Sequence, residues 1–183
     1  MVLTESTSMA IGSTAPEFTL PDTRDNRLVS LSNYEKKPVL IVFMCNHCPY
    51  VVHLVDELAS VAHQFAADGI ATITISSNDS ATYPQDGPEK MGDLARRGNW
   101  QFPYCFDETQ EIARAYGAVC TPDIFLFDAN HGLYYQGQFD ETRPGQAKAH
   151  GGDLKNAATS LLAGKPAPTS THPSVGCSIK WKT

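Results

Sequence analysis

The chain has 183 residues, 14 of them basic and 20 acidic, and a formal net charge of −6. Its 42% apolar content is ordinary for a folded domain, and the absence of a basic cluster argues against nucleic acid as a partner. No run approaches the roughly 18 apolar residues of a membrane span, and the first residues lack the basic and apolar regions of a signal peptide. We therefore expect a cytoplasmic protein without membrane or nucleic-acid partners. The five cysteines should then be catalytic, redox-sensing or buried thiols rather than a disulfide framework.

The predicted elements alternate between strands and helices through the middle of the chain, which indicates an α/β protein. A loose polar lead is expected over residues 1–10. The apolar and turn patterns then predict a hairpin at 18–31, strands at 39–43 and 70–75, helices at 50–67 and 89–97, a short strand at 102–106, a helix at 109–116, strands at 123–127 and 133–139, and a helix at 154–162. Residues 77–88 read as a loop. We expect one domain over residues 1–163, followed by a Pro/Ser/Thr-rich tail over 164–183 that carries Cys177.

A pair of cysteines, Cys45 and Cys48, lies where the most apolar run of the chain gives way to Pro49 and a helical pattern. The N-terminus of a helix offers unpaired N–H groups and a positive dipole, which favour a thiolate over a thiol. We expect an exposed Cys45 at or just before the helix as the attacking thiol, and Cys48 in the first turn as the resolving thiol. A protonated His47 would further favour the Cys45 thiolate and make the couple more oxidising than one with Gly-Pro between its cysteines.

Metal binding is an alternative, because a single Cys-x-x-Cys is also half of a zinc site. The other cysteines, Cys105, Cys120 and Cys177, are scattered singly, whereas a structural zinc site needs four ligands. Haem attachment would need a histidine where Pro49 stands. We assign no metal ligands and no cofactor.

A second motif, Cys120-Thr121-Pro122, precedes the strand at 123–127. A proline there must occupy the first strand residue or an edge. A cis bond before Pro122 would present the backbone of Thr121 to a bound thiol partner, whereas an ordinary trans proline would only begin the strand. Cys120 is either a secondary redox thiol near the site or a small buried residue.

The segment 174–181 is an ordered-looking motif inside the tail. Ile179 and Trp181 are able to dock on the domain. Cys177 is then a resolving or regulatory thiol that pairs with Cys45, Cys48 or Cys120, or an incidental cysteine in a docking strand.

Several motifs in order along residues 12 to about 160 carry a resemblance to a known family. They are Gly12-x-x-Ala15-Pro16-x-Phe18, Cys45-x-x-Cys48-Pro49, Asp107-Glu-Thr-x-x-x-Ala113-x-Ala115-Tyr116-Gly117 and Thr121-Pro122-Asp123. The chain thus resembles the thioredoxin superfamily, and more closely its peroxiredoxin-related redoxin group (alkyl hydroperoxide reductase/thiol-specific antioxidant). The resemblance implies a thioredoxin-like fold, with a central mixed sheet, helices on both faces and an N-terminal β-hairpin. It also implies that Pro122 is a cis-proline facing the dithiol.

The resemblance implies two enzymatic functions. One is a thiol–disulfide oxidoreductase that uses Cys45 and Cys48 on protein or small-molecule thiols and disulfides. The other is a peroxiredoxin-like peroxidase, an antioxidant enzyme with peroxide substrates, in which Cys48 is the peroxidatic cysteine and Cys45 or Cys177 resolves it. Peroxiredoxins typically carry threonine at position 45 and hold peroxide with an arginine, for which Arg114 and Arg143 are candidates. A third, non-enzymatic alternative is a metal-binding or redox-sensing protein, and the oligomeric state stays open.

Overall fold

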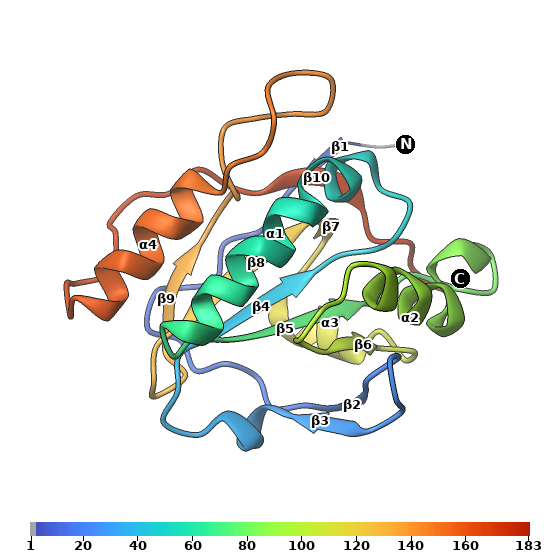
Figure 1. The fold of residues 1–183 in the computed structure, drawn as a ribbon, viewed down its shortest axis with the longest axis horizontal. Coiled ribbons are helices and arrows are strands. Elements are labelled where there is room, and N and C mark those ends of the chain that lie inside the picture. The colour runs from blue at the N-terminus through green and yellow to red at the C-terminus, as the bar shows by residue number, and fades with distance from the viewer. Residues whose placement is uncertain (1–2) are drawn as a thin grey trace.

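The fold is built on a five-stranded mixed sheet in the order β6-β5-β4-β8-β9 (Figure 1). The structure is a computed structural model, which describes residues 3–183. The five strands are β4 (Val39–Phe43), β5 (Ala71–Ser76), β6 (Tyr104–Phe106), β8 (Asp123–Phe127) and β9 (Leu133–Gln136). The β4–β5 and β5–β6 pairs are parallel, whereas β4–β8 and β8–β9 are antiparallel. The predicted central mixed sheet is therefore confirmed.

Helices cover both faces of this sheet. On one face lie α1 (Pro49–Ala67), α2 (Pro88–Arg97) and α4 (Gly152–Leu162), drawn in front in Figure 1, and on the other lies α3 (Glu111–Tyr116). The central strand β4 is buried along its whole length, and its alternate side chains pack toward the two helical layers. A strand covered on both faces needs an apolar residue at every position, which explains the continuous apolar run in the sequence.

The predicted boundaries agree with the observed helices within a few residues. The N-terminal hairpin is confirmed as β2 (Thr19–Pro21) paired with β3 (Leu28–Ser30), and it is followed by a short 3₁₀ helix, η1 (Leu31–Tyr34). The predicted loop over 77–88 contains a second 3₁₀ helix, η2 (Pro84–Asp86). No helix within residues 3–183 is long and apolar enough to cross a membrane.

Both ends of the described chain meet in a second sheet of three strands. In it β10 (Val175–Ser178) lies between β1 (Leu3–Glu5) and β7 (Cys120–Thr121), antiparallel to both. The expected loose lead over residues 1–10 is therefore wrong for β1, while residues 1–2 lie outside the described part. Strands of two to four residues carry no alternation long enough to read from sequence, and these strands depend on pairing with one another.

The C-terminal segment docks on the domain beyond β10 as well. Ile179 is 2% exposed, and Trp181 packs against the same apolar cluster, beneath the guanidinium of Arg114 at 4.4 Å from its ring centroid. The predicted docking of Ile179 and Trp181 is confirmed. Arg114 is therefore engaged by the C-terminal segment.

Candidate active site

The two cysteines of the Cys-x-x-Cys motif lie in the connection from β4 to α1. Cys48 is the N-cap of α1, with extended backbone, and Pro49 is the first helical residue, a position that suits proline because its missing N–H would have no helical partner. We expected Cys48 within the first turn of the helix, but it lies one residue before that turn. Both side chains are buried, with 1% of Cys45 and none of Cys48 exposed. The expectation of an exposed Cys45 is wrong, because its side chain is enclosed in the apolar cluster that also contains Cys48 and contacts Thr121 of β7.

Thr121 contacts both sulfur atoms from β7. The peptide bond between Thr121 and Pro122 is cis, as the resemblance implied. The Cys48 thiol donates a hydrogen bond to the Thr121 carbonyl oxygen over 3.1 Å, and the Cys45 sulfur lies 3.5 Å from the Thr121 hydroxyl. The structure therefore brings together four of the predicted site residues, the two cysteines and the Thr121-Pro122 pair.

The two thiols differ in acidity. A hydrogen bond from the Cys45 thiol lowers the pKa of Cys48 well below its ordinary value, with further donors from Cys177, the Val51 backbone and Thr121. The same bond raises the pKa of Cys45, and burial and the Asp86 carboxylate raise it further. The Thr121 carbonyl opposes ionisation of Cys48, because it accepts a hydrogen bond only from the neutral thiol. The groups that donate to the thiolate outweigh this effect and lower the pKa of Cys48. The expected thiolate at Cys45 is therefore wrong, and Cys48 is the more acidic thiol.

The His47 ring is engaged by a buried aspartate. Its Nδ1 lies 2.6 Å from Asp86 Oδ2, and its ring stacks on Tyr83 with centroids 5.6 Å apart. The fully buried Asp86 also accepts hydrogen bonds from the backbone N–H groups of Asn46 and His47 and from the Asn78 amide. Asp86 thus organises the connection between the two cysteines. No sequence pattern indicates this role, because Asp86 is one acidic residue in a polar loop forty positions from Asn46.

Three side chains of this site meet at distances that a metal ion could bridge. The Cys45 sulfur, a His47 ring nitrogen and an Asp86 carboxylate oxygen lie within 4.8 Å of one another. They are three ligands rather than the four of a structural zinc site, and the carboxylate already accepts several hydrogen bonds. We assign no metal here, and this assignment stays a prediction.

The two additional thiols occupy different positions around the pair. Cys177 lies opposite Thr121 in the β10–β7 register and belongs to the same buried apolar cluster as Cys45 and Cys48. Cys120 is fully buried, its sulfur directed to the Pro122 carbonyl over 3.7 Å, and burial raises its pKa. Cys45, Cys48 and Cys177 therefore form one group of buried thiols, which we call the thiol cluster, and Cys120 lies beside it.

Two openings are lined in part by residues of the site, Asn46 in one and Pro122 in the other. A groove of about 710 Å³ begins at Asn46 and runs along α2 past Lys90, Arg96 and Arg97. A narrow cleft of about 20 Å³, room for one water molecule, lies between Pro122, the first turn of α1 and Arg143. The Arg143 guanidinium donates to the Gln138 side chain and to the backbone of the same loop.

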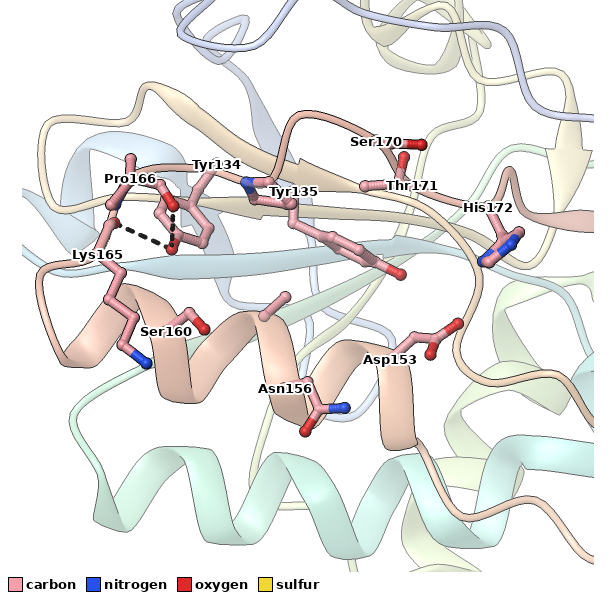
Figure 2. Close-up of a pocket in the computed structure, with 12 residues that line it drawn as sticks. Tyr134, Tyr135, Asp153, Asn156, Ser160, Lys165, Pro166, Ser170, Thr171 and His172 are labelled. Atoms are coloured by element: carbon pink, nitrogen blue, oxygen red, sulfur yellow. Dashed lines mark hydrogen bonds between the residues drawn. The ribbon is translucent and has the colours of Figure 1, made fainter.

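A separate pocket of about 410 Å³ lies between β9, α4 and residues 165–172, and none of the five cysteines lines it (Figure 2). The Tyr134 hydroxyl closes one end by donating to the Lys165 and Pro166 carbonyls, each over 3.1 Å. Because it lacks a sulfur, this pocket is not part of the redox site.

With this geometry, the comparison with known families is decisive. The AhpC/TSA family model matches residues 11–136, more than half of the chain. The chain belongs to the AhpC/TSA family. Within this family, it is 30% identical to the thiol–disulfide oxidoreductase ResA of Geobacillus thermodenitrificans over 130 residues, 69% of this chain and 68% of that protein. It is 28% identical to a Mycobacterium tuberculosis protein named as a peroxiredoxin, over 63% of this chain and 69% of that protein.

Solved structures agree with this assignment. An uncharacterised conserved protein of Geobacillus kaustophilus is 41% identical, with a TM-score of 0.96 over 100% of this chain and 97% of that one. The thioredoxin domain of a Bacteroides vulgatus thiol–disulfide oxidoreductase is 19% identical, with a TM-score of 0.63 over 81% of this chain and 98% of that one. The AhpC/TSA chain therefore has a thioredoxin-like fold and is a thiol-based redoxin.

Proposed function

We propose that this redoxin is a thiol–disulfide oxidoreductase whose redox centre is the Cys45–Cys48 pair. The observation that carries the proposal is that both sulfur atoms lie against Thr121, at the junction of a rigid central strand and a helix N-terminus. Cys45 Sγ is 3.5 Å from the Thr121 hydroxyl, and Cys48 Sγ is 3.1 Å from the Thr121 carbonyl oxygen. Two thiols that share one contact residue and lie three positions apart in the chain can close into a disulfide without a large backbone movement. The similarity to ResA supports the same activity.

The acidity of the two thiols favours Cys48 as the attacking group, the reverse of the order expected from sequence. The Cys48 thiolate attacks one sulfur of a substrate disulfide, forms a mixed disulfide and expels the other sulfur as a thiolate. Cys45 gives its proton to that leaving thiolate and attacks Cys48 Sγ. The mixed disulfide breaks, the Cys45–Cys48 disulfide forms, and the substrate leaves fully reduced. The basic groove beside Asn46 gives substrates an approach to this connection.

A second candidate activity, peroxide reduction by Cys48, is favoured by the several hydrogen bonds that stabilise its thiolate. The thiolate would attack the terminal oxygen of a peroxide and become a sulfenic acid as an alkoxide or hydroxide leaves. Cys45 would then condense with the sulfenic acid and release water. The mycobacterial relative named as a peroxiredoxin supports this activity, and Arg143 lines the adjacent cleft.

Single-cysteine variants separate the two activities. We expect Cys48→Ser to lose both insulin disulfide reduction with dithiothreitol and any peroxide consumption. The double variant Cys45→Ser/Cys177→Ser, which removes both other thiols near Cys48, should lose catalytic insulin turnover while accumulating a mixed disulfide at Cys48. The matched control is Cys105→Ala, since Cys105 is a fully buried core thiol on β6.

Each outcome bears on one proposal. Retention of insulin turnover in both Cys45→Ser and Cys48→Ser would eliminate the dithiol mechanism. A mixed disulfide trapped at Cys45 in Cys48→Ser, with none at Cys48 in Cys45→Ser/Cys177→Ser, would reverse the assigned order of attack. Peroxide consumption that survives Cys48→Ser would eliminate the peroxidase activity of Cys48.

A further inference from the structure

The C-terminal strand β10 occupies the backbone edge of β7 next to the dithiol. Cys177 lies opposite Thr121, and Ser178 lies opposite Cys120, in antiparallel register. The other edge of β10 pairs with β1, where Leu3 lies opposite Cys177. A segment more than a hundred residues from the dithiol in sequence thus fills the position in which an extended peptide could pair with Thr121.

Gly176 permits this close approach. A Cβ atom at position 176 would lie 1.9 Å from the Thr121 carbonyl oxygen, the same oxygen that accepts the hydrogen bond from Cys48. Only glycine fits there, so β10 can approach β7 closely enough to place the next residue, Cys177, beside Cys45 and Cys48. Its side chain is 4% exposed and belongs to the same apolar cluster as Cys45 and Cys48.

The chain is anchored on both sides of Cys177. Before it, the Ser174 hydroxyl donates to the Gly137 carbonyl over 2.7 Å. After it, the Lys180 backbone N–H donates to Asn78 Oδ1 over 2.9 Å, and the Asn78 amide in turn donates to Asp86. Since Asp86 holds the connection between Cys45 and Cys48, a short hydrogen-bond chain joins the two segments that carry the three thiols. The position of Cys177 is therefore fixed by the same network as the dithiol.

We propose that Cys177 is a third redox thiol of this site and that Cys48 forms two alternative intramolecular disulfides, one with Cys45 and one with Cys177. The inference rests on the proposed reactivity of Cys48 toward disulfides. Cys48 donates to the carbonyl oxygen of Thr121, whose hydroxyl contacts Cys45 and which lies opposite Cys177 in the β10–β7 register. Cys48 is therefore the shared member of the two pairs.

The chemistry is a thiol–disulfide exchange in two steps. In a mixed disulfide between Cys48 and a substrate sulfur, Cys177 attacks Cys48 Sγ. The bond to the substrate breaks, the Cys48–Cys177 bond forms, and the departing substrate thiolate takes the proton of Cys177. Cys45 can then attack Cys48 Sγ in the same way, which forms the Cys45–Cys48 disulfide and returns Cys177 to the thiol with no net oxidation. Glutathione disulfide serves as the oxidant for a test.

The experiment follows a glutathione adduct on Cys48 when Cys45 is absent. Cys45→Ser and the double variant Cys45→Ser/Cys177→Ser are treated with glutathione disulfide and followed by intact mass and non-reducing peptide mapping. We expect a stable glutathione adduct at Cys48 in the double variant. In Cys45→Ser, the adduct should decay at least roughly tenfold faster into a Cys48–Cys177 disulfide, because the attack is intramolecular. Adding Cys120→Ser to Cys45→Ser should leave that disulfide in place.

Two results would overturn the inference in distinguishable ways. An adduct that lasts as long in Cys45→Ser as in the double variant, or a cross-link that maps to Cys120, would refute the role of Cys177 and leave the dithiol mechanism intact. No adduct at Cys48 in the double variant would refute the proposed reactivity of Cys48, and with it the inference. Thermal unfolding of both variants checks that each is folded.

Discussion

Replacing Gly176 by alanine should loosen β10 from β7. The added Cβ would lie 1.9 Å from the Thr121 carbonyl oxygen and 2.6 Å from its carbon, and both are backbone atoms of a strand that also contacts the dithiol. Even a tight Cβ contact needs about 3.0 to 3.4 Å, so the two strands must separate by more than 1 Å. Separation of that size breaks or lengthens the hydrogen bonds between β10 and β7.

The magnitude follows from overpacking of a buried site, which typically costs about 1–3 kcal/mol. For a chain of this length, 1 kcal/mol lowers the melting temperature by roughly 2–4 °C, so we expect a decrease of roughly 2–12 °C. The Cys177 thiol should become more accessible at the same time, because it is buried only while β10 is paired with β7.

Urea unfolding and the rate of iodoacetamide labelling at Cys177, read by peptide mapping, measure the two effects. Ser178→Ala is the matched control, since it changes the same strand without adding a side-chain atom, and should remain within about 0.5 kcal/mol of the parent. A Gly176→Ala variant with the parent's unfolding midpoint and labelling rate would refute the described approach of β10 to Thr121.

Three further predictions concern the ionisable groups. Burial raises the pKa of Asp123 to about 8, and its carboxylate has no hydrogen-bond partner of good geometry within residues 3–183, so the folded state holds its proton more tightly than the unfolded chain. Stability should therefore fall as the pH rises from about 4 to 8. Asp123→Asn should flatten that part of a urea-unfolding pH series, and an unchanged slope would contradict the assignment. Asp86→Asn places an amide among four hydrogen-bond donors. It should lower the free energy of unfolding, measured in urea, by about 1.5–3 kcal/mol. The control is Asp93→Asn, at a half-buried carboxylate that pairs with Lys90 and Arg96 on its own helix, and equal losses would count against the role of Asp86. Cys45→Ala removes the leading donor to Cys48, so the pH midpoint of Cys48 alkylation should move upward from well below the ordinary thiol value. An unchanged pH midpoint of Cys48 alkylation would show that Cys45 does not stabilise the Cys48 thiolate.

The parts of the fold that were predictable from sequence are those defined by local patterns. The continuous apolar run of β4 and the helical spacing of α1 placed the dithiol at a strand-to-helix junction, because each pattern is set by residues close together in the chain. The cis bond before Pro122 followed from the resemblance.

The remaining features depend on residues distant in sequence. Cys45 contacts Thr121, more than 70 positions later, and the acidity of Cys48 arises partly from Cys177 on β10, more than 120 positions later. No local pattern in these segments indicates that they meet. Asp86 acts on the Cys45–Cys48 connection across about forty positions, and an aspartate in a polar loop looks the same whether it is buried or exposed. The reversed thiol acidities arise first from the interaction of Cys45 with Cys48, to which the long-range contacts of Cys177 and Asp86 add.

The place of β10 in the chain also has a consequence for biosynthesis. Every other strand and helix described here precedes β10, so the ribosome completes the reactive centre only after it has made the rest of the domain. At about 5–20 residues per second, roughly 6–26 s separate the synthesis of Cys48 from that of Cys177. During that interval the nascent domain presents a dithiol without its covering strand, and small oxidants or a passing thiol protein have their easiest access to it.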